Sequence, residues 1–465
     1  MFVADSRSPL AGLRVLDLSY VFAVPYMGGL LSDLGAEVIK VEAPHRLDQT
    51  RATFGPYLDN DPGDEPWNRT GTFHMLNRGK RSFVLDLGKP AGRELLKKLV
   101  AKSDMVLDNF TPRVMRGWDL HYEQLRKLNP ALIMLSNTGY GSTGPWAAFP
   151  SQGTTLEATM GITHYSGYRN DKPWKVGQSY PDFLACWSGL FALLVALHHR
   201  RKTGEGQWID LGMYQIGAAL IPEPMLQLQA DGSDWERIGN EHRTLAPYNL
   251  YPAGGDDAWI AISITNEEQW QQLVHVMGKA ELLSDTRFRD MQTRLQNREA
   301  LDELMAGWTR ERDAGEMTAL LQGVGVPAGP VLNSRDLLLD AHLRDRRFYE
   351  LVEHARPVGL RPIIGRPFRF RFRDLKVRKG APRFGEGNSY VLRDILGMGD
   401  EEIGRLYVEN VVSDHPTAPR EVGPQNFEQM LRVGTLVEVD PDHKSRFGAE
   451  VSPAKDSVHG AVIGD

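Results

Sequence analysis

The chain has 465 residues, of which 41% are hydrophobic and 25% charged, a composition typical of folded globular proteins rather than disordered ones. Its 54 Lys and Arg residues are outnumbered by 60 Asp and Glu residues, and the net charge of −6 leaves no basic excess to hold a nucleic-acid backbone. The single cysteine, Cys186, can form neither an internal disulfide nor a thiolate metal cluster, so we expect a reducing, cytoplasmic location. The N-terminus lacks a signal-peptide pattern, and no run of 18 uncharged apolar residues predicts a membrane span.

Short apolar strands alternate with helical segments over the first 215 residues. The hydrophobic pattern predicts strands at 13–18, 37–41, 82–87, 104–107 and 132–136, and helices at 27–34, 90–102 and 122–128. Such alternation predicts an open parallel sheet with right-handed crossovers, flanked by helices. A long apolar helix is then predicted from 183 to 201, ended by Thr203 and Gly204.

The pattern of predicted strands and helices changes near residue 230. A strand is predicted at 258–264, helices at 266–278, 297–310 and 314–322, and a turn that enters a strand at 325–331. We therefore expect an α/β protein whose large domain comprises 1–225 and returns at 334–410, with a smaller α+β domain at 226–333. Residues 411–465 are rich in Pro and Asp and weakly periodic, which indicates an extended arm or tail.

Two motifs have ordinary structural interpretations. The glycines of 139–144 match G-x-G-x-x-G after a strand, but Pro145 and Pro150 interrupt the helix that a dinucleotide fingerprint requires, so we expect a tight loop able to line a ligand cleft. The alternating basic and aromatic residues of 366–373 predict a half-buried strand with phenylalanines inward, rather than a nucleic-acid surface. Neither the histidines nor Cys186 show metal-ligand spacing, and we expect no metal.

Asp182 stands immediately before the long apolar helix and has two interpretations. Asp is a common N-cap residue, and capping alone would explain its position. Alternatively, the helix N-terminus holds this carboxylate ionised and partly shielded from water, where it can attack an activated acyl group.

The ordered motifs of the chain resemble those of the class III CoA-transferases, the family of formyl-CoA transferase, carnitine CoA-transferase and α-methylacyl-CoA racemase. The resemblance extends from about residue 9 to about residue 406. It rests on segments 9–18 (PLAGLRVLDL), 34–42 (LGAEVIKVE), 77–82 (NRGKRS), 108–112 (DNFTP), 139–145 (GYGSTGP), 201–207 (RKTGEGQ) and 325–331 (GVPAGPV). Each motif alone is weak, whereas their order and spacing together are specific.

This resemblance implies that Asp182 is the nucleophile of a CoA transfer between an acyl-CoA and a free carboxylic acid. The family's aspartate attacks the thioester, and mixed-anhydride and aspartyl-CoA thioester intermediates follow. The resemblance also implies a Rossmann-like large domain, coenzyme A as co-substrate and an interlocked dimer. A homodimer or a heteromer with a related subunit is compatible with one chain, and neither nucleic acid nor membrane is an expected partner.

Candidate CoA contacts are carried over from the family only where the motifs match. They are Val21, Phe22, Leu85, Asn109, Phe110 and Tyr140 in loops after strands, and the cations Arg46, Arg51, Arg113 and Arg116. Guanidinium groups suit phosphates, although for Arg46 and Arg51 a solvated loop is the alternative.

The chain departs from the family pattern at several positions. Ala23-Val24-Pro25 replaces the usual A-G-P, Gly117 stands where a basic residue is common, and the glycine-rich active-site loop has no counterpart near 240–260. Racemase members carry a histidine where this chain has Gln152, which weighs against racemisation. An acyl-CoA racemase or epimerase, and a catalytically inactive subunit, remain the alternatives.

Overall fold

The computed structural model describes residues 8–52, 56–177, 180–355, 358–371, 375–419 and 421–450, which divide into two compact units. Unit 1 comprises 1–161, 177–222 and 339–465, and unit 2 comprises Ile162–Val176 and Glu223–Leu338. The predicted domain limits at 225 and 333 lie close to 222 and 338. The sequence did not predict that 162–176 leaves the large domain.

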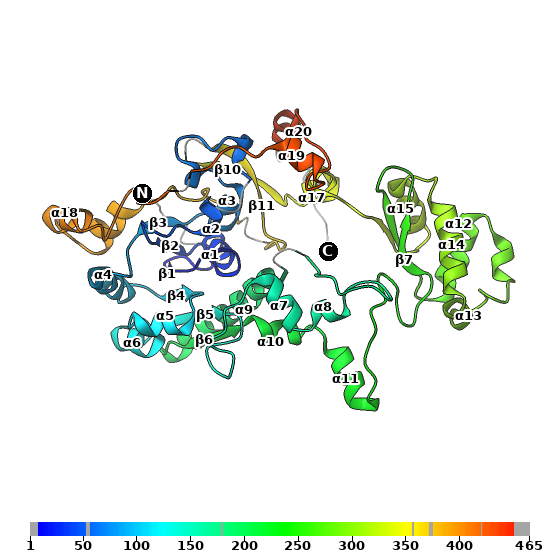
Figure 1. The fold of residues 1–465 in the computed structure, drawn as a ribbon, viewed down its shortest axis with the longest axis horizontal. Helices are drawn as coiled ribbons and strands as arrows, with labels where there is room; N and C mark the ends of the chain where they lie inside the picture. The colour runs from blue at the N-terminus through cyan, green and yellow to red at the C-terminus, as the bar shows by residue number, and fades with distance from the viewer. Residues whose placement is uncertain are drawn as a thin grey trace. The chain divides into compact units, whose positions relative to one another are not determined.

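Unit 1 is built on a six-stranded parallel sheet with the order β3-β2-β1-β4-β5-β6 (Figure 1). The strands are β1 (Arg14–Asp17), β2 (Glu37–Glu42), β3 (Arg81–Val84), β4 (Met105–Asp108), β5 (Ile133–Thr138) and β6 (Trp208–Gly212). All neighbouring pairs are parallel, as the alternation of strands and helices predicted. The strand order reverses between β1 and β4, and this topological switch point is where open α/β sheets bind ligands.

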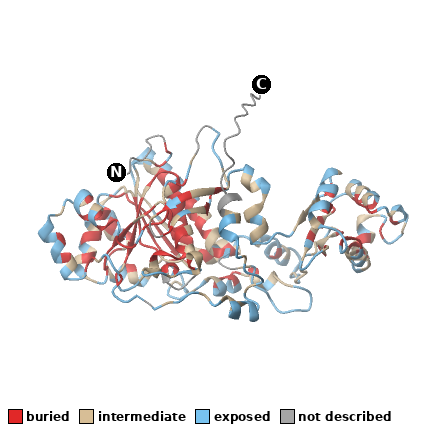
Figure 2. Ribbon diagram, turned by 90° about the horizontal axis from the view of Figure 1, so that it is seen from above, coloured by how far each residue is buried: buried red, intermediate tan, exposed pale blue. Residues whose placement is uncertain are grey.

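Helices cover both faces of this sheet, and the buried residues concentrate around it (Figure 2). On one face α1 (Ala23–Asp33) packs against α9 (Tyr180–Thr203), and α9 also contacts β5 and β6. On the other face the core joins the sheet to α4 (Pro90–Val100), α6 (Tyr122–Leu128) and α18 (Asp400–Val408). Short helices α3 (Gly71–Leu76), α5 (Pro112–Gly117), α7 (Gly153–Thr159) and α10 (Met213–Ala218) lie among the connections.

Helix α9 is long and apolar enough to cross a membrane by length and composition, which the sequence analysis did not anticipate. In the structure its buried residues include Ala185, Cys186, Gly189 and Leu193, which belong to the packed interior of unit 1. A core helix passes the same test of length and composition. One side of α9 packs into unit 1, whereas Phe191 and Val195 are exposed, so burial in unit 1 accounts for only part of its apolar pattern.

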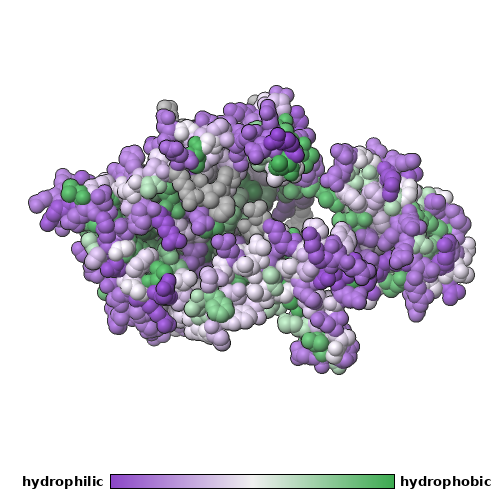
Figure 3. Space-filling model, in the orientation of Figure 1, coloured by the Kyte–Doolittle hydropathy of each residue, from purple (hydrophilic) through white to green (hydrophobic). Residues whose placement is uncertain are grey.

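Unit 2 contains an antiparallel sheet in the order β7-β8-β9, with β7 (Tyr248–Pro252), β8 (Trp259–Ser263) and β9 (Ala328–Pro330). Its apolar core joins this sheet to α12 (Glu267–Met277), α14 (Arg298–Thr309) and α15 (Ala314–Gly323). Segment 162–176, which includes α8 (Ile162–Tyr165), is held by the Tyr165 hydroxyl, which donates to Asp234 Oδ1 at 2.8 Å. Apolar residues of α11 (Pro222–Asp231), among them Leu226, lie at the surface among hydrophilic ones (Figure 3).

Two expectations for the C-terminal third need correction. Residues 366–371 form no half-buried strand: Arg366 is buried and pairs with Asp33 at 3.1 Å, whereas Phe370 is exposed. Residues 372 and 373 lie outside the described residues. The segment after 410 begins as part of unit 1 rather than as a loose tail, because Val411 and Val412 are buried in its core. Further along, the Thr417 amide donates to the Pro44 carbonyl at 2.9 Å.

Candidate active site

The turns after β1 and β4 meet at the carboxyl edge of the sheet, where the strand order reverses. The Tyr20 amide donates to Asn109 Oδ1 at 3.0 Å, and Asn109 Nδ2 donates to the Tyr20 carbonyl at 2.7 Å. The rings of Tyr20 and Phe110 pack edge to face, with centroids 5.8 Å apart. Because both hydrogen bonds use the Asn109 side chain, this residue holds the two turns together beside the expected ligand position.

The turn from β1 into α1 holds a strained residue. Val21 has φ of +72°, which is costly for a β-branched residue and persists only where its surroundings over-determine the backbone. Those surroundings are visible: the Val21 amide donates to Asp48 Oδ1 at 3.2 Å, and Lys40 Nζ donates to the Ser19 carbonyl at 2.5 Å. Strain held in this way marks a candidate functional turn.

Asp182 lies in the first turn of α9 and also faces the beginning of α1. The Ala23 amide, at the first residue of α1, donates to its carboxylate. The two helices approach closely because Gly189 has no side chain: a Cβ there would lie 2.4 Å from Met27 Cε. Tyr26 packs edge to face on Phe183, with centroids 5.5 Å apart. The carboxylate therefore sits at the N-terminal ends of two helices, where their dipoles favour negative charge.

Burial raises the pKa of Asp182 to about 6, although the Ala23 amide and its own backbone amide oppose this shift. Among the described residues, no cation helps to lower the pKa of Asp182. The side chain is nevertheless only partly buried. Asp182 is thus an ionisable group that is desolvated, hydrogen-bonded by backbone amides and still accessible, as a carboxylate nucleophile requires.

The start of α7 lies beside Asp182. A Cβ on Gly153 would lie 3.5 Å from Asp182 Oδ2, so glycine leaves space beside the carboxylate. Gly139 adjoins the same segment, since its Cβ would lie 1.9 Å from Ser151 Oγ. The loop that follows Gly139 is fixed by the Ser142 amide, which donates to both carboxylate oxygens of Asp210 at 2.9 Å.

The predicted CoA contacts occupy different environments. Val21, Phe22, Asn109, Phe110 and Tyr140 are partly exposed in turns at the carboxyl edge, and Arg46, Arg113 and Arg116 are exposed. The Arg46 guanidinium lies 5.9 Å from the centroid of the Tyr20 ring, beside the β1 turn. These positions bring the predicted contacts to one edge of the sheet.

The side chains of two predicted contacts, Arg51 and Leu85, do not point to that edge of the sheet. Arg51 is fully buried, its Nε and Nη2 donate to Glu42 at 2.9 and 3.0 Å, and its guanidinium lies 3.5 Å from the Phe73 ring centroid. Leu85 is 1% exposed and packs in the core. The expectation that the Arg51 guanidinium meets a phosphate is therefore corrected, because its charge is already neutralised within unit 1.

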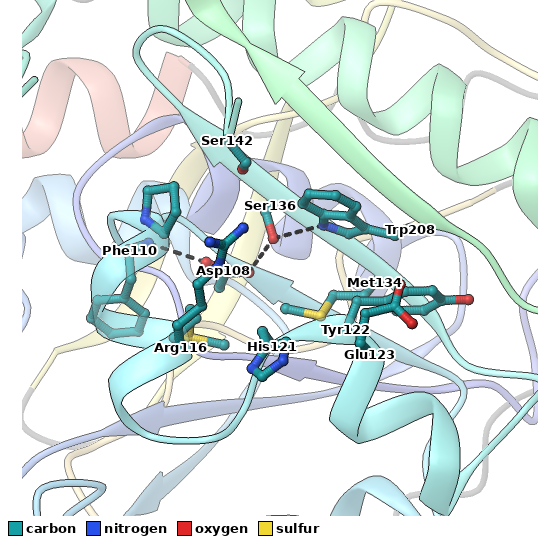
Figure 4. A pocket seen from close by; sticks show the side chains of 12 residues that line it. Asp108, Phe110, Arg116, His121, Tyr122, Glu123, Met134, Ser136, Ser142 and Trp208 are labelled. Carbon is teal, nitrogen blue, oxygen red and sulfur yellow. Dashed lines mark hydrogen bonds between the residues drawn. The ribbon is translucent and has the colours of Figure 1, made fainter. Parts of the chain in front are cut away.

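A pocket beside the same edge is lined by residues from β4, β5, β6, α5 and α6 (Figure 4). Its empty space is about 500 Å³, including the open mouth. At its base Trp208 Nε1 donates to Ser136 Oγ at 3.2 Å, and Ser136 Oγ donates to Asp108 Oδ2 at 2.7 Å. The Phe110 amide donates to Asp108 Oδ1 at 3.2 Å, so this chain of contacts fixes the turn that carries Asn109. Burial raises the pKa of Asp108 to about 7.

Sequence reasoning missed the buried ionic residues beneath the β1 turn, namely Asp17, Lys40, Asp48 and Lys80, each with 0% exposure. Lys40 lies within an apolar motif and Lys80 follows a glycine. A charged residue in such a motif was the available sign that these lysines are buried. Among the described residues, no group of His, Cys, Asp and Glu side chains could hold a metal ion.

Comparison with known proteins shows which family the chain belongs to. Residues 10–388 match the model of CoA-transferase family III, so the chain belongs to that family. It is 34% identical to succinyl-CoA–D-citramalate CoA-transferase of Chloroflexus aurantiacus over 404 residues, which cover 87% of this chain and 98% of the relative. It is 30% identical to succinate–glutarate CoA-transferase of Agrobacterium fabrum over 391 residues, 84% of this chain and 96% of the relative.

Among solved structures, a CAIB/BAIF family protein from Brucella suis has 33% sequence identity and a TM-score of 0.76. The match covers 83% of this chain and 99% of that chain. The protein is accordingly a class III CoA-transferase with the α/β fold of its family.

Proposed function

We propose that the protein transfers CoA from an acyl-CoA to a free carboxylic acid through covalent intermediates on Asp182. The observation that carries this proposal is the environment of Asp182: a partly buried carboxylate that accepts a hydrogen bond from the Ala23 amide and has a pKa raised to about 6. A raised pKa makes an ionised carboxylate a better nucleophile, and at neutral pH most of it is ionised.

The first half of the reaction loads CoA onto the enzyme. A carboxylate oxygen of Asp182 attacks the thioester carbonyl carbon, the C–S bond breaks, and a mixed anhydride and CoA thiolate result. The thiolate sulfur then attacks the Asp182 carbonyl carbon. The donor acid leaves as a carboxylate, and an aspartyl-CoA thioester remains.

The second half reverses these events with the acceptor. The acceptor carboxylate attacks the aspartyl-CoA carbonyl and expels CoA thiolate, giving a second anhydride. The thiolate attacks the acceptor's acyl carbon, which forms the new acyl-CoA and restores the Asp182 carboxylate. No net proton or redox change occurs, so the protein's contribution is to position reactants, exclude water and donate hydrogen bonds to the oxyanions.

The named relatives support dicarboxylic substrates. Both carry succinyl-CoA or succinate in their names, together with citramalate or glutarate. We propose succinyl-CoA as the donor and a dicarboxylic acid of similar size as the acceptor, used in a reducing cytoplasm. The exposed cations Arg46, Arg113 and Arg116 supply charge for the phosphates of CoA.

The test is the rate of CoA transfer from succinyl-CoA to glutarate, citramalate and succinate, the last isotopically labelled, by wild-type protein and Asp182→Asn. We expect Asp182→Asn to lose at least a thousandfold, because neither anhydride nor thioester can form. Asp302→Asn in unit 2 is the matched control, since Asp302 is also a partly buried carboxyl with a raised pKa, caused chiefly by burial, and it should retain wild-type transfer.

Two results would contradict the proposal. Unchanged transfer by Asp182→Asn would leave Asp182 as a helix cap. Incorporation of solvent deuterium at Cα of a 2-methylacyl-CoA, without transfer to any acid, would indicate a racemase instead.

A further inference from the structure

Lys80 is a buried cation directly beneath the first turn of α1. It is fully buried, and its ammonium group donates to Asp17 Oδ2 at 2.6 Å, Asn77 Oδ1 at 2.8 Å and the Pro25 carbonyl at 2.7 Å. These contacts account for its three N–H donors. The Pro25 carbonyl belongs to α1, so Lys80 ties this helix to the end of β1 and to the residue after α3.

The helix backbone lies directly on the ion pair because Gly28 has no side chain. A Cβ at Gly28 would lie 2.9 Å from Asp17 Oδ2 and 3.0 Å from Lys80 Nζ. Any larger residue would therefore have to lift α1 or displace one of the two charges. The spacing between α1 and the ion pair is set by direct contact.

The same turn of α1 supplies the hydrogen bond to Asp182. Ala23, whose amide donates to the Asp182 carboxylate, is two residues before Pro25. Lys80 also lies near α9, because its charge, with that of Arg78, acts to lower the pKa of Cys186, which burial raises to about 12. Cys186 follows Asp182 by one helical turn.

We propose that Lys80 is a positioning residue for the nucleophile: it holds the first turn of α1 at the depth where the Ala23 amide meets the Asp182 carboxylate. This inference rests on the proposed function of Asp182. It assigns a role in the reaction to a buried ion pair that would otherwise be only structural.

The other titratable groups around Asp182 come from each element packed there. Tyr26 stands on α1, Cys186 on α9 and Glu157 on α7, while Arg78 and Lys80 lie in the turn before β3. Apart from desolvation, only backbone amides shift the pKa of Asp182, so Lys80 acts through α1 rather than by its own charge.

The sharpest variant is Gly28→Ala, which keeps every charge and pushes α1 away from Lys80. The readout is the titration of the Asp182 carboxyl carbon by ¹³C NMR of protein labelled at aspartate, assigned by difference from Asp182→Asn. We expect the Asp182 pKa to rise by about one unit, a tenfold change in the ionisation constant, as the Ala23 hydrogen bond lengthens. Gly404→Ala in α18 is the matched control, because a Cβ there meets nothing within 4 Å, and it should leave the titration unchanged.

A second, charge-balanced variant, Lys80→Met with Asp17→Asn, removes the tether and should also raise the Asp182 pKa by about tenfold in the ionisation constant. Its control is Arg294→Met with Glu267→Gln, which removes a pair with a fully buried guanidinium in unit 2. An unchanged Asp182 titration in Gly28→Ala, or in the folded double variant, would overturn the positioning role. Because the titration is read without turnover, that result is distinct from failure of the proposed function, which appears as retained transfer in Asp182→Asn.

Discussion

Two desolvated carboxylates of unit 1, Asp17 and Asp182, differ in the groups that stabilise their negative charge. Burial opposes ionisation of Asp17, but Lys80, then Lys40, and hydrogen bonds from Lys80 and Ser19 outweigh it and lower the pKa of Asp17. Asp182 experiences the same desolvation with only backbone amides to oppose it, and its pKa rises to about 6. Asp17 lies against Gly28 of α1, and Asp182 lies beside Ala23, the first residue of the same helix.

This difference separates a carboxylate that supports the fold from one that is available for chemistry. A carboxylate bound to a buried cation is held in its ionised form, and the ion pair makes it a poor nucleophile. A carboxylate stabilised only by amide dipoles keeps its charge on an accessible oxygen, at a cost in folding stability. Four predictions, on variants or on pH, test how buried ionisable groups in unit 1 affect stability and activity.

Removing Asp17 should have the largest effect on stability. Asp17→Ala leaves the Lys80 ammonium buried without its counter-ion, and we expect the free energy of unfolding to fall by about 3–5 kcal/mol. Urea denaturation at pH 7 measures it. Glu94→Ala in α4, which breaks a solvent-exposed pair with Lys97, is the control and should cost less than about 1 kcal/mol. Equal losses in the two variants would contradict the distinction.

The activity of the wild-type protein should lose its ionised nucleophile in acid. With a pKa of about 6 for Asp182, kcat/KM for the acyl-CoA half-reaction should fall about tenfold per pH unit below pH 6. Measuring the release of the donor acid from acyl-CoA in the absence of an acceptor removes the acceptor's own ionisation from the profile. An acid limb near pH 4 would mean that Asp182 is solvated rather than buried.

Neutralising Asp182 should stabilise the fold. The folded-state pKa of about 6 exceeds the ordinary value of 3.8, so the folded state binds the proton more tightly and loses stability as the pH rises through this range. At pH 7–8 we expect Asp182→Asn to raise the free energy of unfolding by up to about 3 kcal/mol, and the gain should vanish below pH 4. A melting temperature that falls in Asp182→Asn at pH 7.5 would contradict this.

The smallest effect concerns a pair of neutral histidines that fastens α3 to β10 (Tyr349–His354) in unit 1. His74 Nε2 faces the Asn68 carbonyl at 2.9 Å and must carry a proton, so His74 Nδ1 accepts from His354 Nδ1 at 3.0 Å. Burial lowers the pKa of His74 to about 4 and of His354 to about 3.

Because each unfolded histidine takes up a proton below about pH 6.5 and the folded one does not, each histidine should lower the free energy of unfolding by up to about 2 kcal/mol between pH 7 and pH 5. Urea titrations of wild-type protein and His354→Gln compare the slopes. His354→Gln should show the shallower loss, and identical slopes would contradict the assignment.

The sheet, the large domain and the position of Asp182 could be predicted because each leaves a local pattern: apolar strands of four to six residues, intervening helices and an acid at the start of a long apolar helix. The helix was expected to begin after Asp182, whereas it begins at Tyr180 and holds Asp182 in its first turn. The ionic layer beneath α1 could not, since Lys80, Pro25 and Asp17 become neighbours only through the crossover from β1 to β3. Arg51 illustrates the same limit. The family resemblance placed Arg51 where a basic residue can meet a phosphate of CoA, but its guanidinium pairs with Glu42 at the end of β2.

The alternating residues of 366–373 show a different failure. Period-two alternation predicts a strand with one apolar face, whereas Arg366 is turned inward by two carboxylates, Asp33 and Glu350, at 3.1 and 2.8 Å. Buried acids from α1 and β10 outweigh the local pattern, and no sequence window contains both.

The most direct test of covalent catalysis is to trap the activated carboxyl group of Asp182. Wild-type protein incubated with succinyl-CoA and hydroxylamine, without an acceptor acid, is digested and analysed by mass spectrometry. We expect a hydroxamate on Asp182, with one CoA thiol released per modified chain and no modification at Asp17 or Asp302. An unmodified Asp182 after this treatment, in a protein that transfers CoA when an acceptor acid is supplied, would contradict covalent catalysis by Asp182.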